Sequence, residues 1–303
     1  MLTKILKRCL SAPFGRRSAM KDVYILYNPK SGDGRSRDAA LCLSKKYPDA
    51  NVEVLDATRI FDFKKFTMGL DERTSIILCG GDGTINYFIN NISKRDIGYG
   101  LFYYPTGSGN DFLRDLGKTP DDCPVRINEY VKSLPSVTVK DKRYSFINGV
   151  GFGIDGYCCE EGDKLKAAGK TKINYTSIAI KGLLFKYKTT SATVEVDGEV
   201  HTFKRVWLAP TMNGRFYGGG MMATPSQDRL GEDKKVSLLV FHGSGKLGTL
   251  MIFPSIFKGE HVKKTKNVTV FTGKKIKVTF SSPRPCQIDG ETVTDVTTYT
   301  VTV

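Results

Sequence analysis

Strand-like runs and segments of helical spacing alternate through the first 117 residues. The expected strands are apolar or alternate between apolar and polar positions, and one of them, at 74–81, is continuously apolar, as in strands buried on both faces. This alternation favours a parallel sheet with helices on its faces. The expected strands lie at 22–29, 51–58, 74–81 and the start of 99–117, and the expected helices at 37–47, 62–70, 85–92 and the end of 99–117.

The pattern changes after about residue 135. Segments rich in Val and Thr, separated by turn residues, predict an antiparallel β domain that a single helical segment at about 173–187 interrupts. The Val- and Thr-rich segments are 136–155, 190–213, 234–241, 266–293 and 296–303. The fold class predicted is therefore α/β plus all-β, with an α/β domain over 22–135 and an antiparallel β domain over 136–303.

The first 21 residues form a basic leader. Within MLTKILKRCL, apolar residues recur at helical intervals with basic residues between them, which predicts either a short amphipathic helix on a membrane surface or a disordered leader. Charge interrupts the apolar positions, so the segment is not typical of a secretory signal. An over-long translation start is a third interpretation, because Met20 immediately precedes the first clear strand.

The chain carries 46 Lys and Arg against 31 Asp and Glu, a net charge of +15. Such an excess favours a polyanionic partner (nucleic acid, nucleotide phosphates or an anionic membrane), although most single lysines belong to an ordinary solvated surface. The basic residues gather at 4–17, 164–188 and 258–277. No apolar run reaches transmembrane length. The seven scattered cysteines lack a C-x-x-C pair, which indicates a reducing compartment and argues against a structural zinc site.

Three glycine-containing loops follow three of the expected parallel strands. They are NPKSG at 28–32, GGDGT at 80–84 and PTGSGND at 105–111. Ligands of open α/β sheets bind along this carboxyl edge, and each loop precedes a helix whose free N–H groups favour an anion. Glycine permits positive φ and a close approach of phosphate to the backbone. Ser31, Thr84 and Ser108 add hydroxyl donors, although Thr84 could instead cap its helix. The three loops together favour a phosphate-bearing ligand.

Asp82 lies inside one of these loops, which match neither G-x-x-x-x-G-K-[ST] nor G-x-G-x-x-G. Its carboxylate would repel phosphate unless a cation intervened. This indicates Mg²⁺ between carboxylate and phosphate, an arrangement that suits phosphoryl transfer from a nucleotide.

Six motifs occur in order along the chain: YNPKSG, GGDGTIN, PTGSGNDFLRDLG, FINGVGFGID, FYGGGM and QIDGE. Together they resemble the diacylglycerol kinase catalytic family, which includes bacterial lipid kinases and sphingosine kinases, from about Asp22 to the end. GGDGT alone is not specific, because NAD kinases and phosphofructokinases carry similar loops. The resemblance implies an α/β nucleotide domain, a β-sandwich lipid-substrate domain, an active site in the cleft between them, and ATP with Mg²⁺.

The resemblance also implies roles for single residues. Glu291 corresponds to the acceptor of the lipid hydroxyl proton, and Asp289 and Asp82 are further candidates for catalysis and for binding metal. Ser108 replaces the usual Thr of G-T-x-N-D and keeps a hydroxyl. The residues expected around the nucleotide are Asn28, Pro29, Ser31, Gly32, Thr58, Gly80, Gly81, Asp82, Gly83, Thr84, Ile85, Asn86, Ser108, Asn110 and Asp111.

Two departures from the family pattern stand out. Tyr87 occupies the place of the Glu that commonly ends G-G-D-G-T-x-N-E. The D-G-x-L turn that holds a structural metal in the family is missing from the longer segment 224–241, where Asp228, Glu232 or Asp233 could serve instead.

The Asp-Gly-Glu turn at 289–291 could also be an ordinary hairpin, because Asp-Gly is a favoured turn dipeptide. The same letters recur at 197–199, where the flanking alternation predicts a plain hairpin. The three histidines lack ligand spacing, and Trp207 is expected in the core.

The sequence therefore predicts an ATP-dependent lipid kinase that transfers the γ-phosphoryl group to a diacylglycerol-like or sphingoid hydroxyl. A kinase of NAD or another soluble alcohol, and a non-catalytic nucleotide-binding protein, remain alternatives. Nucleic acid is not an expected partner, because no sheet face clusters aromatic and basic residues. The expected partners are a lipid substrate and an anionic membrane surface, reached peripherally from the cytoplasm, and exposed strand edges would permit a homodimer.

Overall fold

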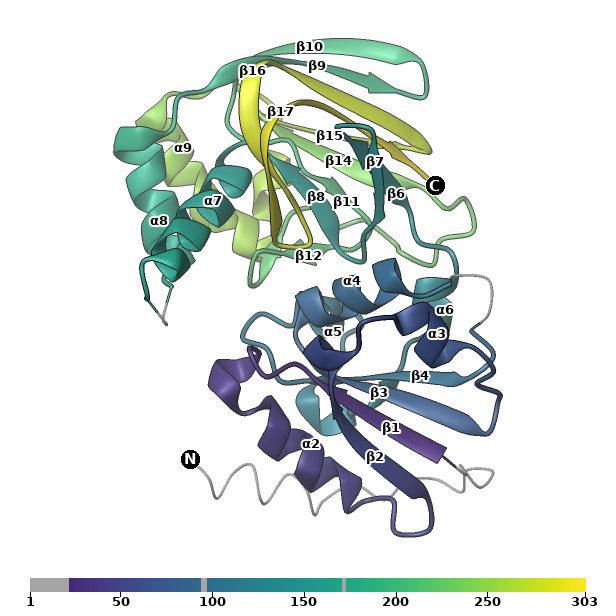
Figure 1. Cartoon of the computed structure of the whole chain (residues 1–303). Coiled ribbons are helices and arrows are strands. Elements are labelled where there is room, and N and C mark those ends of the chain that lie inside the picture. The colour runs from purple at the N-terminus through teal and green to yellow at the C-terminus, as the bar shows by residue number, and fades with distance from the viewer. Residues whose placement is uncertain (1–21, 94–96, 171–172) are drawn as a thin grey trace. The chain divides into compact units, whose positions relative to one another are not determined.

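The computed structural model describes residues 22–93, 97–170 and 173–303 (Figure 1). The chain divides between Ser133 and Leu134 into two compact units. An α/β unit precedes a unit built on an antiparallel sheet, so the predicted fold class is confirmed. The leader at 1–21, with its predicted amphipathic helix, lies outside the described residues.

The first unit contains a five-stranded sheet in the order β2-β1-β3-β4-β5. The strands are β1 (Asp22–Tyr27), β2 (Asn51–Asp56), β3 (Thr74–Gly80), β4 (Gly100–Pro105) and β5 (Val125–Arg126). The first four are parallel, and β5 pairs antiparallel with β4. β3 is buried along its whole length, as its continuous apolar run predicted. The strand order reverses between β1 and β3, which is where ligands of such sheets bind.

Helices cover both faces of this sheet because β1 alternates its side chains. Val23 and Ile25 pack against Leu43 of α2, while the ring of Tyr24 meets that of Phe66 of α3 at 5.3 Å on the opposite face. The helices are α2 (Ser36–Ser44), α3 (Phe63–Thr67), α4 (Asp82–Asn91), α5 (Asp111–Asp115) and α6 (Asn128–Lys132), with 3₁₀ turns η1 (Gly32–Gly34), η2 (Ala57–Arg59) and η3 (Pro120–Asp122).

The second unit contains a ten-stranded antiparallel sheet. Its path runs β15-β14-β11-β8-β16-β17-β6-β7, and β9 pairs with β16 and β10. The strands are β6 (Ser136–Val139), β7 (Lys142–Ser145), β8 (Gly149–Phe152), β9 (Thr190–Val196), β10 (Glu199–Val206), β11 (Thr211–Met212), β14 (Val236–Phe241), β15 (Val268–Gly273), β16 (Lys275–Ile288) and β17 (Glu291–Thr302), with β12 (Phe216–Tyr217) and β13 (Met221–Met222) as a separate ribbon. β16 changes partner along its length, from β9 at 276–280 to β8 at 286–288, and so joins two parts of the sheet.

Helices lie at one end of this sheet (Figure 1). The predicted helical segment is present as α8 (Tyr175–Lys181) with a π-helical continuation, η4 (Gly182–Lys186). The remaining helical elements are α7 (Ile154–Ala167), α9 (Lys246–Ile252), η5 (Phe253–Lys258) and η6 (Glu260–Lys263).

The prediction of a single helical segment in this unit is wrong. The buried positions of the 14-residue helix α7 include Ile154, Cys158 and Gly162, which are spaced four residues apart. Two of these three are not strongly apolar, so the helical stripe is hard to recognise in the sequence. A Cβ at Gly162 would lie 2.6 Å from the ring of Tyr175, so glycine at this position lets α7 and α8 touch.

Trp207 is buried in the core of the second unit, as predicted, and its indole N–H donates to the Ser244 carbonyl at 3.0 Å. None of the helices within the described ranges combines the length and apolar content that crossing a bilayer requires.

Candidate functional site

The three glycine loops of the first unit touch one another at the carboxyl edge of the sheet. The Thr106 hydroxyl donates to Ser31 Oγ at 3.3 Å. The amides of Thr106 and Gly107 donate to the Gly80 carbonyl at 2.8 and 3.2 Å, respectively. The loops after β1, β3 and β4 therefore form one continuous surface.

Glycines stand at the points of contact between these loops. A Cβ at Gly32, whose φ is +61°, would lie 2.2 Å from the Thr106 carbonyl oxygen, and one at Gly107 would lie 2.6 Å from the Gly81 Cα. These two glycines are therefore required for the loops to contact one another. The sequence had instead suggested that the glycines allow the close approach of a phosphate. Gly83 is different, because nothing lies within 4 Å of its Cβ position and its backbone is open to a ligand.

Asn28 and Thr84 connect the first loop to α4. Asn28 Nδ2 donates to Thr84 Oγ1 at 3.2 Å, and Thr84 is buried. A Cβ at Gly80 would lie 2.1 Å from this hydroxyl oxygen, so glycine makes room for it. The alternative that Thr84 caps α4 is wrong, since Gly81 is the N-cap and no side chain caps the helix. The amino end of α4 is therefore available to an anion.

Asp82 holds the start of α5. Its Oδ2 accepts from the Asp111 amide at 2.9 Å and its Oδ1 from the Phe112 amide at 3.0 Å. The preceding residue, Asn110, is left-handed at φ 50° and accepts a hydrogen bond from the Tyr103 hydroxyl at 3.0 Å. Asp82 thus has a structural task that its place in a glycine loop did not indicate.

The residues at this edge fit Mg²⁺ that arrives with a nucleotide. Within the described parts of the chain, no three His, Cys, Asp or Glu side chains gather as a metal-binding group. Mg²⁺ in nucleotide sites usually takes one or two carboxylates and completes its coordination with phosphate and water. Half-buried Asp82, beside the open backbone of Gly83, is a donor of this kind.

The other predicted nucleotide residues differ in exposure. Ser108 is exposed, and its hydroxyl forms no hydrogen bond within the described residues. Thr58 is also exposed, at the end of β2, and its hydroxyl donates to Asp56 at 2.7 Å. Ile85 is fully buried, so its side chain packs in the core. If Ile85 contacts the nucleotide as predicted, it must do so through its backbone. Pro29 is half-buried, and Asn86 and Asp111 are buried.

In the second unit, the Asp-Gly-Glu turn at 289–291 joins β16 to β17. Ile288 pairs with Glu291, and both turn residues have positive φ, 46° for Asp289 and 94° for Gly290. This is a two-residue hairpin of the kind that Asp-Gly favours. The turn at 197–198 has the same form, with φ values of 49° and 97°, and confirms the predicted hairpin there.

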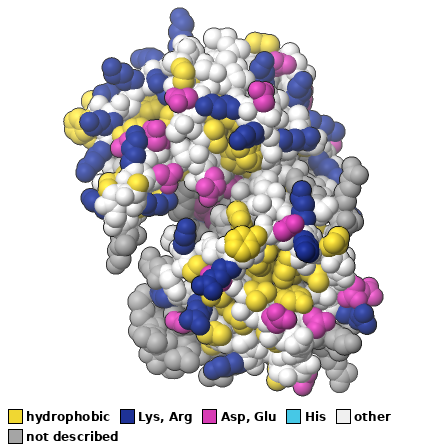
Figure 2. Space-filling view, in the orientation of Figure 1, with side chains coloured by type: hydrophobic (Ala, Val, Ile, Leu, Met, Phe, Trp, Pro, Cys, Tyr) yellow, Lys and Arg dark blue, Asp and Glu magenta, His cyan; other side chains and the backbone are white. Residues whose placement is uncertain are grey.

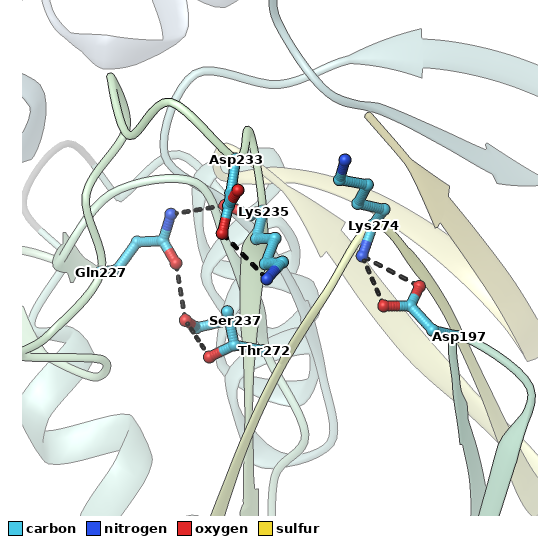
Figure 3. A network of polar contacts seen from close by, with 7 residues as sticks. All are labelled: Asp197, Gln227, Asp233, Lys235, Ser237, Thr272 and Lys274. Carbon is cyan, nitrogen blue, oxygen red and sulfur yellow. Dashed lines mark hydrogen bonds and ion pairs between the residues drawn. The ribbon is translucent and has the colours of Figure 1, made fainter.

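The aspartate of each hairpin binds the backbone of a neighbouring segment. The Asp289 carboxylate accepts from the amides of residues 147, 148 and 149 at 2.6, 2.8 and 2.9 Å. The Asp197 carboxylate accepts from the amides of Lys274 and Lys275 at distances between 2.7 and 3.1 Å, and Figure 3 shows its contact with Lys274. Asp289 is therefore a positioning residue, and its predicted roles in catalysis and metal binding stay predictions.

Glu291 stands at the end of this fixed hairpin. Its side chain is exposed and forms no hydrogen bond or ion pair within the described residues. Glu199 occupies the same place in the other hairpin, where its carboxylate lies 3.8 Å from His201 Nε2. The two glutamates thus form a natural pair for comparison.

The sequence did not reveal a buried polar cluster at the start of α7. Asp155 Oδ1 accepts from the Gly156 amide at 2.9 Å, while Oδ2 lacks a hydrogen-bond partner within the described residues. Burial raises the pKa of Asp155 to about 6. The buried hydroxyl of Tyr217 interacts with the Asp155 carboxyl group and that of Tyr187 with Arg284, in both cases beyond the geometry of an ordinary hydrogen bond. Burial, followed by the charge of Asp155, raises the pKa of Tyr217 well above its ordinary value.

One signal could have indicated this cluster. Asp155 follows a strand that alternates glycine with apolar residues, GVGFG. A Cβ at Gly151 would lie 1.9 Å from Asp155 Oδ2, so the glycine provides the space for the carboxyl group. Buried polar atoms need partners, and here Asp155 interacts with Tyr217 and Tyr187 with Arg284.

The segment considered for a structural metal is organised by Gln227. Its buried amide donates to the Asp228 carbonyl at 3.1 Å. It also donates to the Lys235 carbonyl at 2.9 Å and accepts from Ser237 Oγ at 2.6 Å (Figure 3). Asp228 is exposed and accepts from the Leu230 amide. Asp233 pairs with Lys235 at 3.0 Å, and this hydrogen bond lowers the pKa of Asp233. The predicted metal site at Asp228 therefore gains no converging carboxylate from the described residues.

Family models match two consecutive parts of the chain. Residues 22–137 match the diacylglycerol kinase catalytic domain, and residues 148–303, more than half of the chain, match the YegS C-terminal NAD kinase beta sandwich-like domain. The chain belongs to the diacylglycerol kinase catalytic-domain family. In this family member the two matched regions correspond to the α/β unit and the antiparallel unit.

Relatives extend over most of the chain. The diacylglycerol kinase of Mycobacterium tuberculosis (strain CDC 1551 / Oshkosh) is 25% identical over 269 residues, which cover 84% of both chains. The diacylglycerol kinase of Bacillus subtilis (strain 168) is 24% identical over 286 residues, which cover 90% of both chains. A crystal structure of a diacylglycerol kinase from Bacillus anthracis (strain Sterne) has the same fold, with a TM-score of 0.58 at 17% identity and 94% of each chain covered.

Proposed function

We propose that this protein transfers the γ-phosphoryl group of ATP to a hydroxyl of a diacylglycerol-like or sphingoid lipid. The observation that carries the proposal is the continuous surface of three glycine loops in a member of the diacylglycerol kinase family. The amino end of α4 without a side-chain cap, the open backbone of Gly83 and the exposed Ser108 hydroxyl offer donors to phosphate oxygens.

Asp82 is the residue proposed to hold Mg²⁺ at these phosphates. When bound, the ion neutralises phosphate charge and polarises the transferred group. Asp82 also fixes the amino end of α5 through its two amide contacts. Its carboxylate would therefore serve both the metal and the shape of the loop.

Glu291 is proposed to accept the proton of the lipid hydroxyl. As the hydroxyl oxygen forms its bond to the γ-phosphorus, the proton passes to the carboxylate and the bond between that phosphorus and the departing ADP oxygen breaks. Asp289 would act through Glu291, because its three amide contacts hold the hairpin in place.

The acceptor class is supported by the names of two relatives, which are diacylglycerol kinases.

The experiment is a transfer assay with Mg²⁺ and ATP in which products are identified by mass. Separate reactions contain a lipid extract, dioleoylglycerol in mixed micelles, sphingosine in mixed micelles, or NAD. Phosphorylated lipid with unchanged NAD is the expected result. Formation of NADP would favour the alternative kinase of a soluble alcohol, and ATP binding without transfer in any reaction would favour a non-catalytic protein.

Glu291→Gln keeps the size of the side chain and removes the base. We expect turnover to fall by roughly 10²- to 10⁴-fold, the usual contribution of general base catalysis, while ATP binds with near-normal affinity. The matched control is Glu199→Gln in the other Asp-Gly-Glu hairpin, which should leave turnover unchanged. An active Glu291→Gln enzyme beside an inactive Asp289→Asn enzyme would show that Glu291 is not the base.

A further inference from the structure

The helical end of the second unit exposes apolar side chains in two segments. Phe185 of η4 is 75% exposed, and Leu247 and Met251 of α9 are 73% and 77% exposed. Ile180 of α8 is exposed as well. Leu247 and Met251 are four residues apart in α9 and so share one face of that helix. Large apolar side chains that gather on a surface mark a contact with another molecule or with a membrane.

A hydrogen bond joins the two segments. Lys246 Nζ donates to the Leu184 carbonyl at 2.8 Å, so the residue before Leu247 contacts the residue before Phe185. Figure 1 shows α8 and α9 at the same end of the second unit. Ile180, Phe185, Leu247 and Met251 therefore belong to one surface, which is called the docking face below.

The two segments of the docking face contain lysines and no carboxylate, while the neighbouring helix α7 carries Glu160, Glu161 and Asp163. Residues 173–190 and 243–259 include no Asp or Glu. Figure 2 shows hydrophobic and basic side chains at this end of the second unit, with some acidic side chains among them. The lysines of the two segments, all exposed, are Lys181, Lys186, Lys188, Lys246 and Lys258.

We propose that the docking face inserts its apolar side chains into the interface of an anionic bilayer while its lysines contact lipid phosphates. An apolar centre with a basic rim complements a negatively charged membrane surface. A second copy of the chain would oppose lysines to lysines, and the leader at 1–21, which has no acidic residue, would do the same. The proposal rests on the proposed function, because a lipid kinase meets its acceptor in a bilayer.

The test is sedimentation of the full chain with vesicles of phosphatidylcholine and phosphatidylglycerol, compared with phosphatidylcholine alone. The wild type should bind the anionic vesicles, and more weakly as salt is added. The triple variant Phe185→Ser, Leu247→Ser, Met251→Ser should bind them at least about tenfold more weakly, because it lacks the inserted side chains. Trp207 fluorescence and thermal unfolding verify that it is folded. The matched control changes exposed apolar residues elsewhere: Phe61→Ser, Met68→Ser and Val200→Ser.

A second variant addresses the basic rim. Replacing Lys181, Lys186 and Lys188 with Gln should weaken binding to anionic vesicles and flatten its salt dependence. Wild-type binding by the apolar triple variant overturns the proposal. The proposal is also overturned if the apolar triple variant loses self-association, measured by light scattering, while its vesicle binding is unchanged. That result would assign the face to contact with a second copy of the chain.

Turnover on a water-soluble, short-chain diacylglycerol separates this proposal from the proposed function. Loss of vesicle binding with unchanged turnover in the apolar triple variant supports the docking face. Absence of turnover in a wild type that still binds anionic vesicles through this face overturns the proposed function alone.

Discussion

Asp155→Asn should alter how the stability of the second unit depends on pH. Asp155 is buried, and its carboxyl group interacts with the hydroxyl of Tyr217. Removal from water disfavours its charged form, so the pKa of Asp155 rises from 3.8 to about 6. The asparagine keeps the acceptor for the Gly156 amide and carries no charge at any pH.

The direction of the pH dependence follows from how tightly Asp155 binds its proton in the folded and the unfolded state. Because the folded state holds the proton more tightly, this stabilisation is fully present below pH 3.8 and is lost as the pH rises through about 6. The difference between the two pKa values corresponds to about 3 kcal/mol. Relative to the wild type, Asp155→Asn should therefore gain about 2 kcal/mol in free energy of unfolding between pH 4 and pH 7, because the remainder of the change lies below pH 4. Above pH 7 the difference between the two proteins should stay constant.

Trp207 supplies the assay. It is the single tryptophan of the chain, it is buried in the second unit, and its carbonyl accepts from the Ile154 amide next to Asp155 at 2.9 Å. Urea unfolding followed by Trp207 fluorescence from pH 4 to pH 8 thus reports on this unit. Asp141→Asn, on an exposed turn of the same unit, is the control for the change in net charge. A difference between variant and wild type that stays constant with pH would refute the reasoning.

Three further predictions concern residues of the two candidate sites. Asp289→Ala removes the acceptor for three amides and should lower the free energy of unfolding in urea by about 2–4 kcal/mol. The loss should exceed that of Asp197→Ala, which removes the acceptor for two amides, and the reverse order would contradict the assigned contacts. Gly107→Ala places a Cβ 2.6 Å from the Gly81 Cα, so the two loops must separate. Calorimetric titration should then show ATP binding weakened about tenfold or more. Unchanged affinity would show that the contact between the loops does not shape the nucleotide site. Asp82→Asn should lower turnover on the order of a hundredfold, about 3 kcal/mol of transition-state stabilisation, and near-normal turnover with unchanged Mg²⁺ dependence would argue against its role.

The periodicity of the sequence determined the order of the main strands and helices of the first unit and of the strand-rich segments of the second. The continuous apolar run at 74–81 predicted a strand buried on both faces, and β3 is that strand. The Val- and Thr-rich segments after 135 predicted antiparallel pairing, which the second unit shows. Helical spacing did not reveal α7, because cysteine and glycine occupy two of its buried positions. The absence of a side chain at Gly162 is required by the neighbouring Tyr175, which the sequence pattern of α7 itself does not indicate.

Only the tertiary structure decided what single residues of the candidate sites contact. The two Asp-Gly-Glu segments have the same letters and form the same hairpin, because turn geometry depends on the turn residues themselves. Asp197 holds residues 274–275 and Asp289 holds residues 147–149, segments about 80 and 140 positions away in the chain. A periodic pattern records which side of its own element a residue faces, whereas these partners are brought together by the packing of distant elements. The pattern therefore determined the fold class, and the packing determined what Asp82, Asp155 and Asp289 can do.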